Sequence, residues 1–164
     1  MLNYKEIMAS YQSGDLRIDM YKVDSLDGCP QHVTGDFACD QNMLTSLVGG
    51  PQKVDGYYDC SGNQLTDLVG CASHIGGTLH FPFCDITSLV GIHKIIKSCK
   101  EVSFHCAETK EGGIGLLLIE NLSNISDRTK PFEIIKSYLG TGTKGMMECR
   151  SELISSGYAD YAKL

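Results

Sequence analysis

The chain lacks the features on which several large classes of protein depend. It contains no tryptophan and only four prolines in 164 residues, and its longest apolar run, about five residues around 116–119, is far too short for a membrane-spanning helix. Its 14 basic residues are outnumbered by 20 acidic ones, and the net charge of −6 is the wrong sign for general nucleic-acid binding. The first residues hold no apolar segment typical of secretory signals. We therefore expect a cytoplasmic protein that binds neither nucleic acid nor membranes.

Cysteine, in contrast, is abundant, and its positions repeat. Of the eight cysteines, Cys39 and Cys60 are 21 residues apart, and Cys29 and Cys71 are twice as far apart. At this period three segments align, namely 33–49, 54–70 and 75–91. Self-similarity of this length is typical of a solenoid, in which each unit buries its apolar face only against its neighbours. We interpret the cysteines as small apolar side chains of a shared core.

Within each unit the pattern reads apolar-x-apolar-x-x-Asn/Cys-x-Leu-x-x-Leu, with Asn42, Asn63 and Cys84 at the same place. This pattern resembles the leucine-rich repeat, and the resemblance covers residues 15–105. It implies short parallel strands, a return side made of turns, and an Asn ladder bonded to the backbone. The repeat ending Leu-Thr-Ser-Leu-Val-Gly at 44–49 and the tail at 147–164 also resemble segments of uncharacterised phage and bacterial proteins.

Both ends of the chain have helical rather than repeating patterns. Apolar residues share one helical face over 4–11 before Gly14, and helices are expected over 129–139 and 143–156. Such ends protect the open edges of a solenoid. We predict an α+β fold with three parts: an N-terminal capping helix at 1–14, a leucine-rich-repeat-like solenoid of parallel strands at 15–106, and a C-terminal helical cap at 107–164.

Strand alternation predicts which side chains leave the core. If the apolar positions of each strand point inward, carboxylates, a tyrosine and histidines point outward together with Ala38. The residues expected to bind a partner on this face are Asp36, Asp40, Tyr57, Asp59, Ser61, His80 and His105. A face that is charged only for solubility is the alternative interpretation.

These features predict a non-enzymatic protein-protein interaction module. A rigid sheet loses little entropy on association, and an acidic one suits a partner protein with a basic surface. The phage resemblance implies an accessory protein that binds and blocks a host or defence protein. The motifs G-x-S-x-G, H-E-x-x-H and C-x-x-C are missing, so we predict no catalytic residue and no cofactor.

Two further motifs resemble ligand sites. Cys29 with His32 and Cys71 with His74 resemble half-sites for zinc, but two coils, roughly 10 Å, would separate them, so no metal site is predicted. Residues 140–145 match G-x-G-x-x-G, although a helix rather than a strand precedes them. The alternative function is therefore a small-ligand protein that binds a nucleotide or anion between solenoid and cap. Its candidate anion-binding residues are Thr141, Gly142, Thr143 and Lys144.

Overall fold

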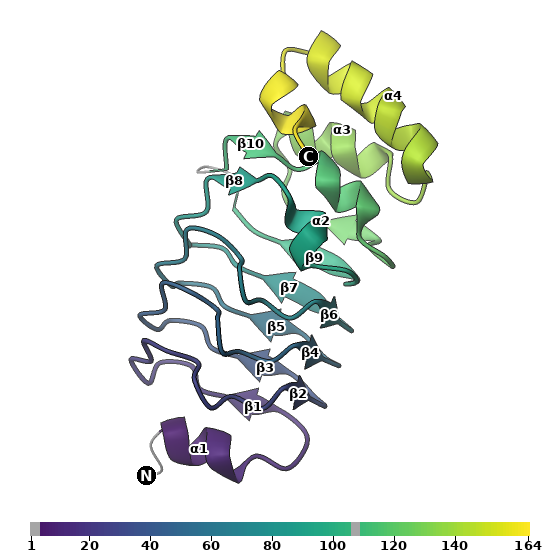
Figure 1. The fold of residues 1–164 in the computed structure, drawn as a ribbon. Coiled ribbons are helices and arrows are strands. Elements are labelled where there is room, and N and C mark those ends of the chain that lie inside the picture. The colour runs from purple at the N-terminus through teal and green to yellow at the C-terminus, as the bar shows by residue number, and fades with distance from the viewer. Residues whose placement is uncertain (1–3, 106–108) are drawn as a thin grey trace.

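The computed structural model describes residues 4–105 and 109–164 and shows short parallel strands stacked coil upon coil between helical ends (Figure 1). The main sheet contains, in this order, β1 (Leu16–Arg17), β3 (Phe37–Ala38), β5 (Tyr58–Asp59), β7 (Thr78–His80), β9 (Glu101–Ser103) and β11 (Asn124–Ile125). A second sheet contains β2 (His32–Val33), β4 (Lys53–Val54) and β6 (His74–Ile75), and β8 (Ser88–Leu89) pairs with β10 (Glu111–Gly112). Together with the terminal helices, this confirms the predicted α+β solenoid.

The register of the main sheet follows the repeat. Phe37 is paired with Leu16 and with Tyr58, each 21 residues away, and every pair of neighbouring strands is parallel. From β7 onward, paired residues on neighbouring strands are more than 21 residues apart in the sequence, as the pairing of Leu79 with Val102 shows. The reason is the short helix α2 (Ile92–Ile95) on the return side, where the sequence predicts only turns.

The solenoid extends further than the repeat pattern indicates. Residues 107–164 were expected to form a helical cap, yet β10 and β11 lie within that range and pair with β8 and β9. A 3-10 helix, η1 (Ile114–Leu118), lies between them and again breaks the 21-residue spacing. The expected boundary between 106 and 107 lies outside the described residues. At least one further coil of the solenoid therefore lies between the expected boundary and the terminal helices.

One continuous core fills the interior of the coils. Its rows include Leu16, Phe37, Tyr58, Leu79, Val102 and Ile125, all at most 2% exposed. All seven cysteines among the described residues are free and buried. Burial raises the pKa of the Cys29 thiol to about 12, and that of Cys60 is also raised, first by burial. These thiols therefore stay protonated at neutral pH and pack as apolar groups.

The expected Asn ladder is present inside the coils. Asn42 accepts the Val23 N–H at 3.0 Å and donates to the carbonyls of Ile18 and Cys39. Cys84 takes the corresponding place in the next unit but one, where its thiol donates to the Cys60 carbonyl at 3.4 Å. Each such side chain satisfies backbone groups that a tight, irregular turn leaves unpaired in the core.

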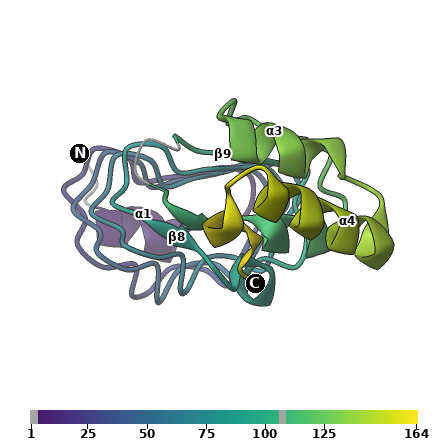
Figure 2. The same ribbon diagram turned by 90° about the horizontal axis from the view of Figure 1, so that it is seen from above.

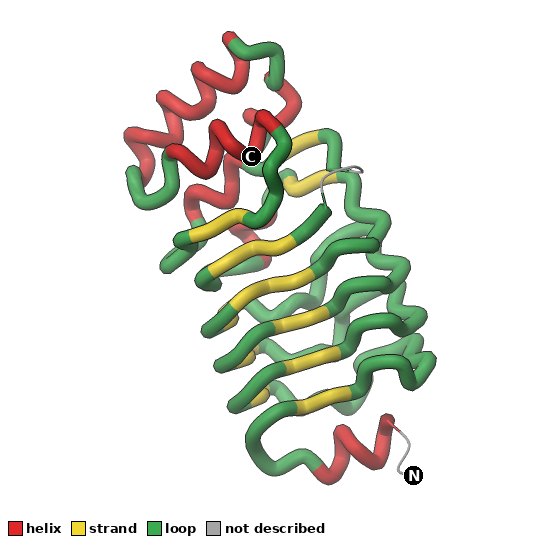
Figure 3. The backbone as a smooth tube through the Cα atoms, turned by 180° about the vertical axis from the view of Figure 1, so that it is seen from behind, coloured by secondary structure: helices red, strands yellow, loops and turns green. Residues whose placement is uncertain are grey.

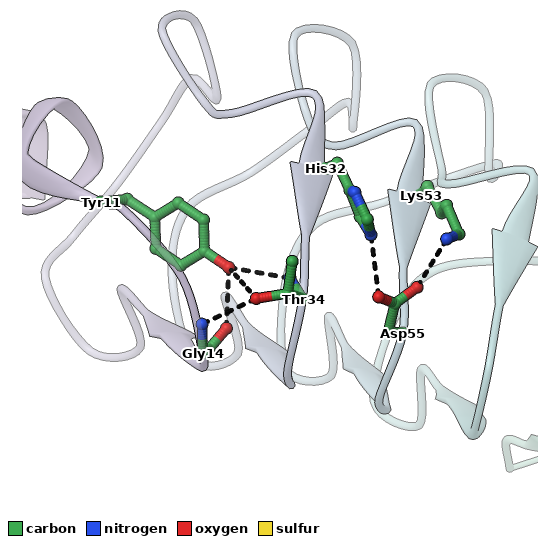
Figure 4. A network of polar contacts seen from close by, with 6 residues as sticks. All are labelled: Tyr11, Gly14, His32, Thr34, Lys53 and Asp55. Atoms are coloured by element: carbon green, nitrogen blue, oxygen red, sulfur yellow. Dashed lines mark hydrogen bonds and ion pairs between the residues drawn. The ribbon is translucent and has the colours of Figure 1, made fainter.

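Helices close both ends of the stack (Figure 2). At the N-terminal end α1 (Tyr4–Ser10) buries Met8, and the Tyr11 hydroxyl accepts the Thr34 N–H at 2.8 Å (Figure 4). The other end holds α3 (Lys130–Ser137), α4 (Gly142–Ser155) and the 3-10 helix η2 (Ala159–Ala162). There the Phe132 ring meets the edge of Phe104, with centroids 5.0 Å apart, so the core runs on into the cap. In the part of the chain that is described, no helix has the length and apolarity needed to cross a membrane.

Candidate functional site

The outward side of the main sheet, here called the strand face, carries three rows of side chains. Figure 3 shows its strands one above another, with helices at the two ends of the stack. The rows are Asp15, Asp36, Tyr57, Thr78, Glu101 and Asn124; Arg17, Ala38, Asp59, His80, Ser103 and Ser126; and Asp19, Asp40, Ser61, Pro82, His105 and Arg128. The seven residues expected to bind a partner all belong to these rows.

The first row contains carboxylates that hold the coils together. Asp36 Oδ1 accepts the Tyr57 N–H at 2.9 Å, and Asp15 Oδ1 accepts the Asp36 N–H at the same distance. A Cβ on Gly56 would lie 2.0 Å from Asp36 Oδ1, so only glycine leaves room for this bond. Asp36 therefore has a structural role that strand alternation did not indicate.

The middle of the face is crossed by an arginine. Arg17 donates to the Tyr57 hydroxyl at 2.7 Å, and its guanidinium carbon lies 5.8 Å from the centre of the Tyr57 ring. Arg17 is paired in register with Ala38, so this reach spans β3. Ala38 is consequently only 1% exposed, and the expectation that it lies open on the outward face is wrong.

Other predicted residues on the face bind one another. Asp59 Oδ1 accepts both the N–H and the hydroxyl of Ser61, at 2.9 and 2.7 Å. His80 Nδ1 lies 2.9 Å from the Ser103 hydroxyl on the neighbouring strand. These bonds hold the side chains of the face in one arrangement.

Asp40 stands in an unfavourable electrostatic position. Partial burial raises its pKa, and the nearby carboxylates of Asp59 and Asp19 raise it further. The Gln41 side-chain amide donates to Asp40 Oδ2 at 3.3 Å. Like charges held together on a half-buried face destabilise the fold, and a cation placed between them would remove that penalty.

A large apolar side chain that strand alternation did not indicate, Phe83, follows β7, two coils after the coil that holds Asp40. Phe83 is 75% exposed and meets the edge of the His105 ring, with centroids 5.9 Å apart. Its φ is 58°, in the left-handed region that also holds Gly62 and Gln41, the residues one and two repeats earlier. A bulky residue with this backbone conformation is strained. The signal that could have found it is a phenylalanine where other units have glutamine or glycine.

The other candidate sites are not assembled. Cys29 and Cys71 are buried, whereas His32 and His74 are exposed on the second sheet. Across residues 4–105 and 109–164, no group of three or more His, Cys, Asp or Glu side chains is placed to hold a metal ion.

The predicted anion-binding residues lie at the start of α4, where Thr141 is the N-cap residue and Gly142, Thr143 and Lys144 form the first turn. Thr141, Gly142, Thr143 and Lys144 are all exposed there, and the Thr141 hydroxyl donates to the Tyr138 carbonyl. Thr141 makes no side-chain bond to the first turn of α4. This part of the small-ligand alternative stays a prediction.

By its fold, the chain is a short parallel β-solenoid closed by helices. Comparison with protein-family models, with curated proteins and with solved structures finds no significant match in any of the three.

Proposed function

We propose that this chain is a non-enzymatic protein-binding module that uses the strand face to hold a partner with a basic surface. The face is flat, regular and already ordered by internal bonds, such as those from Arg17 to Tyr57 and between Asp59 and Ser61. Binding to such a surface costs little conformational entropy on this side of the interface.

The observation that carries the proposal is the grouping of Asp40 with Asp59 and Asp19. Their mutual repulsion, together with burial, raises the pKa of Asp40. A lysine or arginine of a partner placed here would relieve this repulsion and form charge-assisted hydrogen bonds. The acidic group therefore stabilises the complex at some expense to the free chain.

Phe83 supplies the apolar contact that such an interface needs. Aromatic side chains that become buried at the centre of an interface dominate binding energy, and exposed charges at the rim set orientation and association rate. Phe83 is strained and largely exposed, and a partner that covers it would bury apolar surface that the free chain leaves in water.

The resemblance of the repeats to leucine-rich repeats supports the same use, since that family commonly binds partners through its strand face. The resemblance to phage repeat proteins extends the proposal to an accessory protein that occludes a basic surface of a host or defence protein. Such an inhibitor would act sterically, because a rigid face covers the surface of the protein that it binds.

A charge-reversal pair tests the proposal. Asp19→Lys with Asp40→Lys changes the strand face, and Asp24→Lys with Asp85→Lys makes the same change in net charge at exposed positions elsewhere on the solenoid. Each variant, and the wild type, is used to capture partners from a lysate of host cells. We expect a protein retained by the wild type and the second variant and lost by the first.

Binding of the captured protein is then measured with purified components as the salt concentration rises. Affinity for the wild type should fall with ionic strength, because the contact is between opposite charges. Equal recovery by both charge variants, with their folds unchanged by circular dichroism, would remove the strand face as the binding surface.

A further inference from the structure

A hollow of about 300 Å³ lies on the outer side of the second sheet, at its C-terminal edge. It exists because Gly76 stands between Asp55 of the coil before and Lys100 of the coil after, and so leaves a gap in a row of long side chains. Glycine is required here, since a Cβ on Gly76 would lie 2.0 Å from the Asp55 carbonyl oxygen. The gap is thus built into the backbone rather than left by a movable side chain.

The walls of the hollow are rich in hydrogen-bond donors. Lys53, His74, Ser98, Lys100 and Asn121 all line it. The His74 ring uses Nδ1 on the Ser73 hydroxyl, at 2.9 Å, which leaves Nε2 for a ligand. Among the described residues, no carboxylate lies within ion-pair distance of the Lys100 ammonium.

The one acidic side chain of the hollow is already neutralised. Asp55 binds Lys53 through Oδ1 and His32 through Oδ2, each at 2.9 Å (Figure 4). These bonds lower the pKa of Asp55, with the Lys53 bond contributing most. Asp55 therefore holds Lys53 at the rim and repels an incoming anion less than an unpaired carboxylate would.

From this arrangement we infer that the hollow is a binding site for the phosphoryl group of a small molecule. A phosphate group offers three or more terminal oxygens with two negative charges, enough to accept bonds from two ammonium groups, a hydroxyl and an amide together. A monocarboxylate has only two oxygens for these donors. The volume is at the lower end of the range for ligand pockets, which suits a phosphorylated metabolite rather than a large cofactor.

The site is independent of the strand face, because it lies on β4 and β6 and the segments after them. It gives an acidic chain a local basic region formed by Lys53 and Lys100. Net charge alone therefore does not describe what this surface attracts.

The test is a titration of the full chain, labelled with ¹⁵N, in phosphate-free buffer at constant ionic strength. The probes are inorganic pyrophosphate and ribose 5-phosphate, with ribose as the uncharged control. We expect saturable shifts of the amides of Gly76, Ser98 and Lys100, with a dissociation constant of about 1 mM or tighter for at least one probe, and no shift with ribose.

Lys100→Gln is the test variant, since Lys100 holds no ion pair that the fold needs. Lys94→Gln is the matched control, because it removes an equal charge from an exposed position on α2 outside the hollow. The first should weaken binding about tenfold or more, and the second should change it less than twofold. Equal weakening by both, or no saturation by either probe at about 10 mM, would overturn the inference.

Discussion

Replacing Asn63 by alanine removes a buried amide that joins two coils of the solenoid. Its Oδ1 accepts the Leu44 N–H at 3.0 Å, and its Nδ2 donates to the carbonyls of Cys39 and Cys60 at 3.0 and 2.9 Å. The side chain is 5% exposed, so water cannot easily replace these bonds. We expect Asn63→Ala to destabilise the fold strongly.

The loss of stability depends on which of these backbone groups keep another hydrogen-bond partner in the variant. The Cys39 carbonyl still accepts from Asn42, and the Cys60 carbonyl from the Cys84 thiol. The Leu44 N–H has no other partner among the described residues, and an unpaired buried donor costs about 1–3 kcal/mol. With about 0.5–1.5 kcal/mol for each of the two carbonyl contacts that are lost, the total comes to about 2–6 kcal/mol.

Urea unfolding followed by circular dichroism measures this change as a lower midpoint at unchanged slope. Gln64→Ala is the control, because Gln64 is the exposed neighbour and its loss should stay within about 0.5 kcal/mol. A loss below about 0.5 kcal/mol for Asn63→Ala would show that the side chain does not satisfy the backbone of the core.

Three other variants test separate features of the chain. Tyr58 is fully buried, and its hydroxyl has no hydrogen-bond partner in the part of the chain that is described. Tyr58→Phe should therefore raise the free energy of unfolding by about 1 kcal/mol. A decrease in this free energy, measured by urea unfolding, would reveal a hydrogen bond to the hydroxyl. The pKa of Asp40 is raised in the folded state, so the folded chain binds this proton more tightly than the unfolded one and loses stability as pH rises above the ordinary value of 3.8. Asp40→Asn should therefore raise the melting temperature at pH 7 but not at pH 3, and an equal gain at both pH values would contradict this reasoning. Phe83→Asn should raise stability by about 0.5 kcal/mol, since asparagine tolerates a positive φ better, and should weaken partner binding measured by calorimetry; unchanged affinity would exclude Phe83 from the interface.

The repeat made most of the solenoid predictable. A period of 21 residues places Phe37 beside Tyr58 and stacks the Asn positions, because identical coils can only pack in register. The period fails where α2 and η1 add residues to the return side, and β11 was missed for that reason. The short strands themselves hold too few residues to be recognised without the repeat.

For the strand face, the sequence predicts only which side chains point outward, because strand alternation carries no information about contacts between coils. Alternation correctly indicates that Asp40 and His80 point outward, since it depends on one strand alone. It could not indicate that Asp36 binds the amide of Tyr57, or that Arg17 reaches Tyr57 across Ala38, because both depend on the next coil. Long polar side chains therefore have to be placed on the stacked coils before their availability to a partner is known.

The two sheets differ in charge although they belong to the same coils. The strand face groups Asp40 with Asp59, whereas the second sheet places Lys53 and Lys100 around the gap at Gly76. In a solenoid each row of side chains can vary without disturbing the core, because the buried rows alone set the stacking. A chain with a net charge of −6 can thus present an acidic surface to a protein and a basic hollow to a small anion. The strand-face and Lys100 variants alter different rows, so each should change one of these properties and leave the other intact.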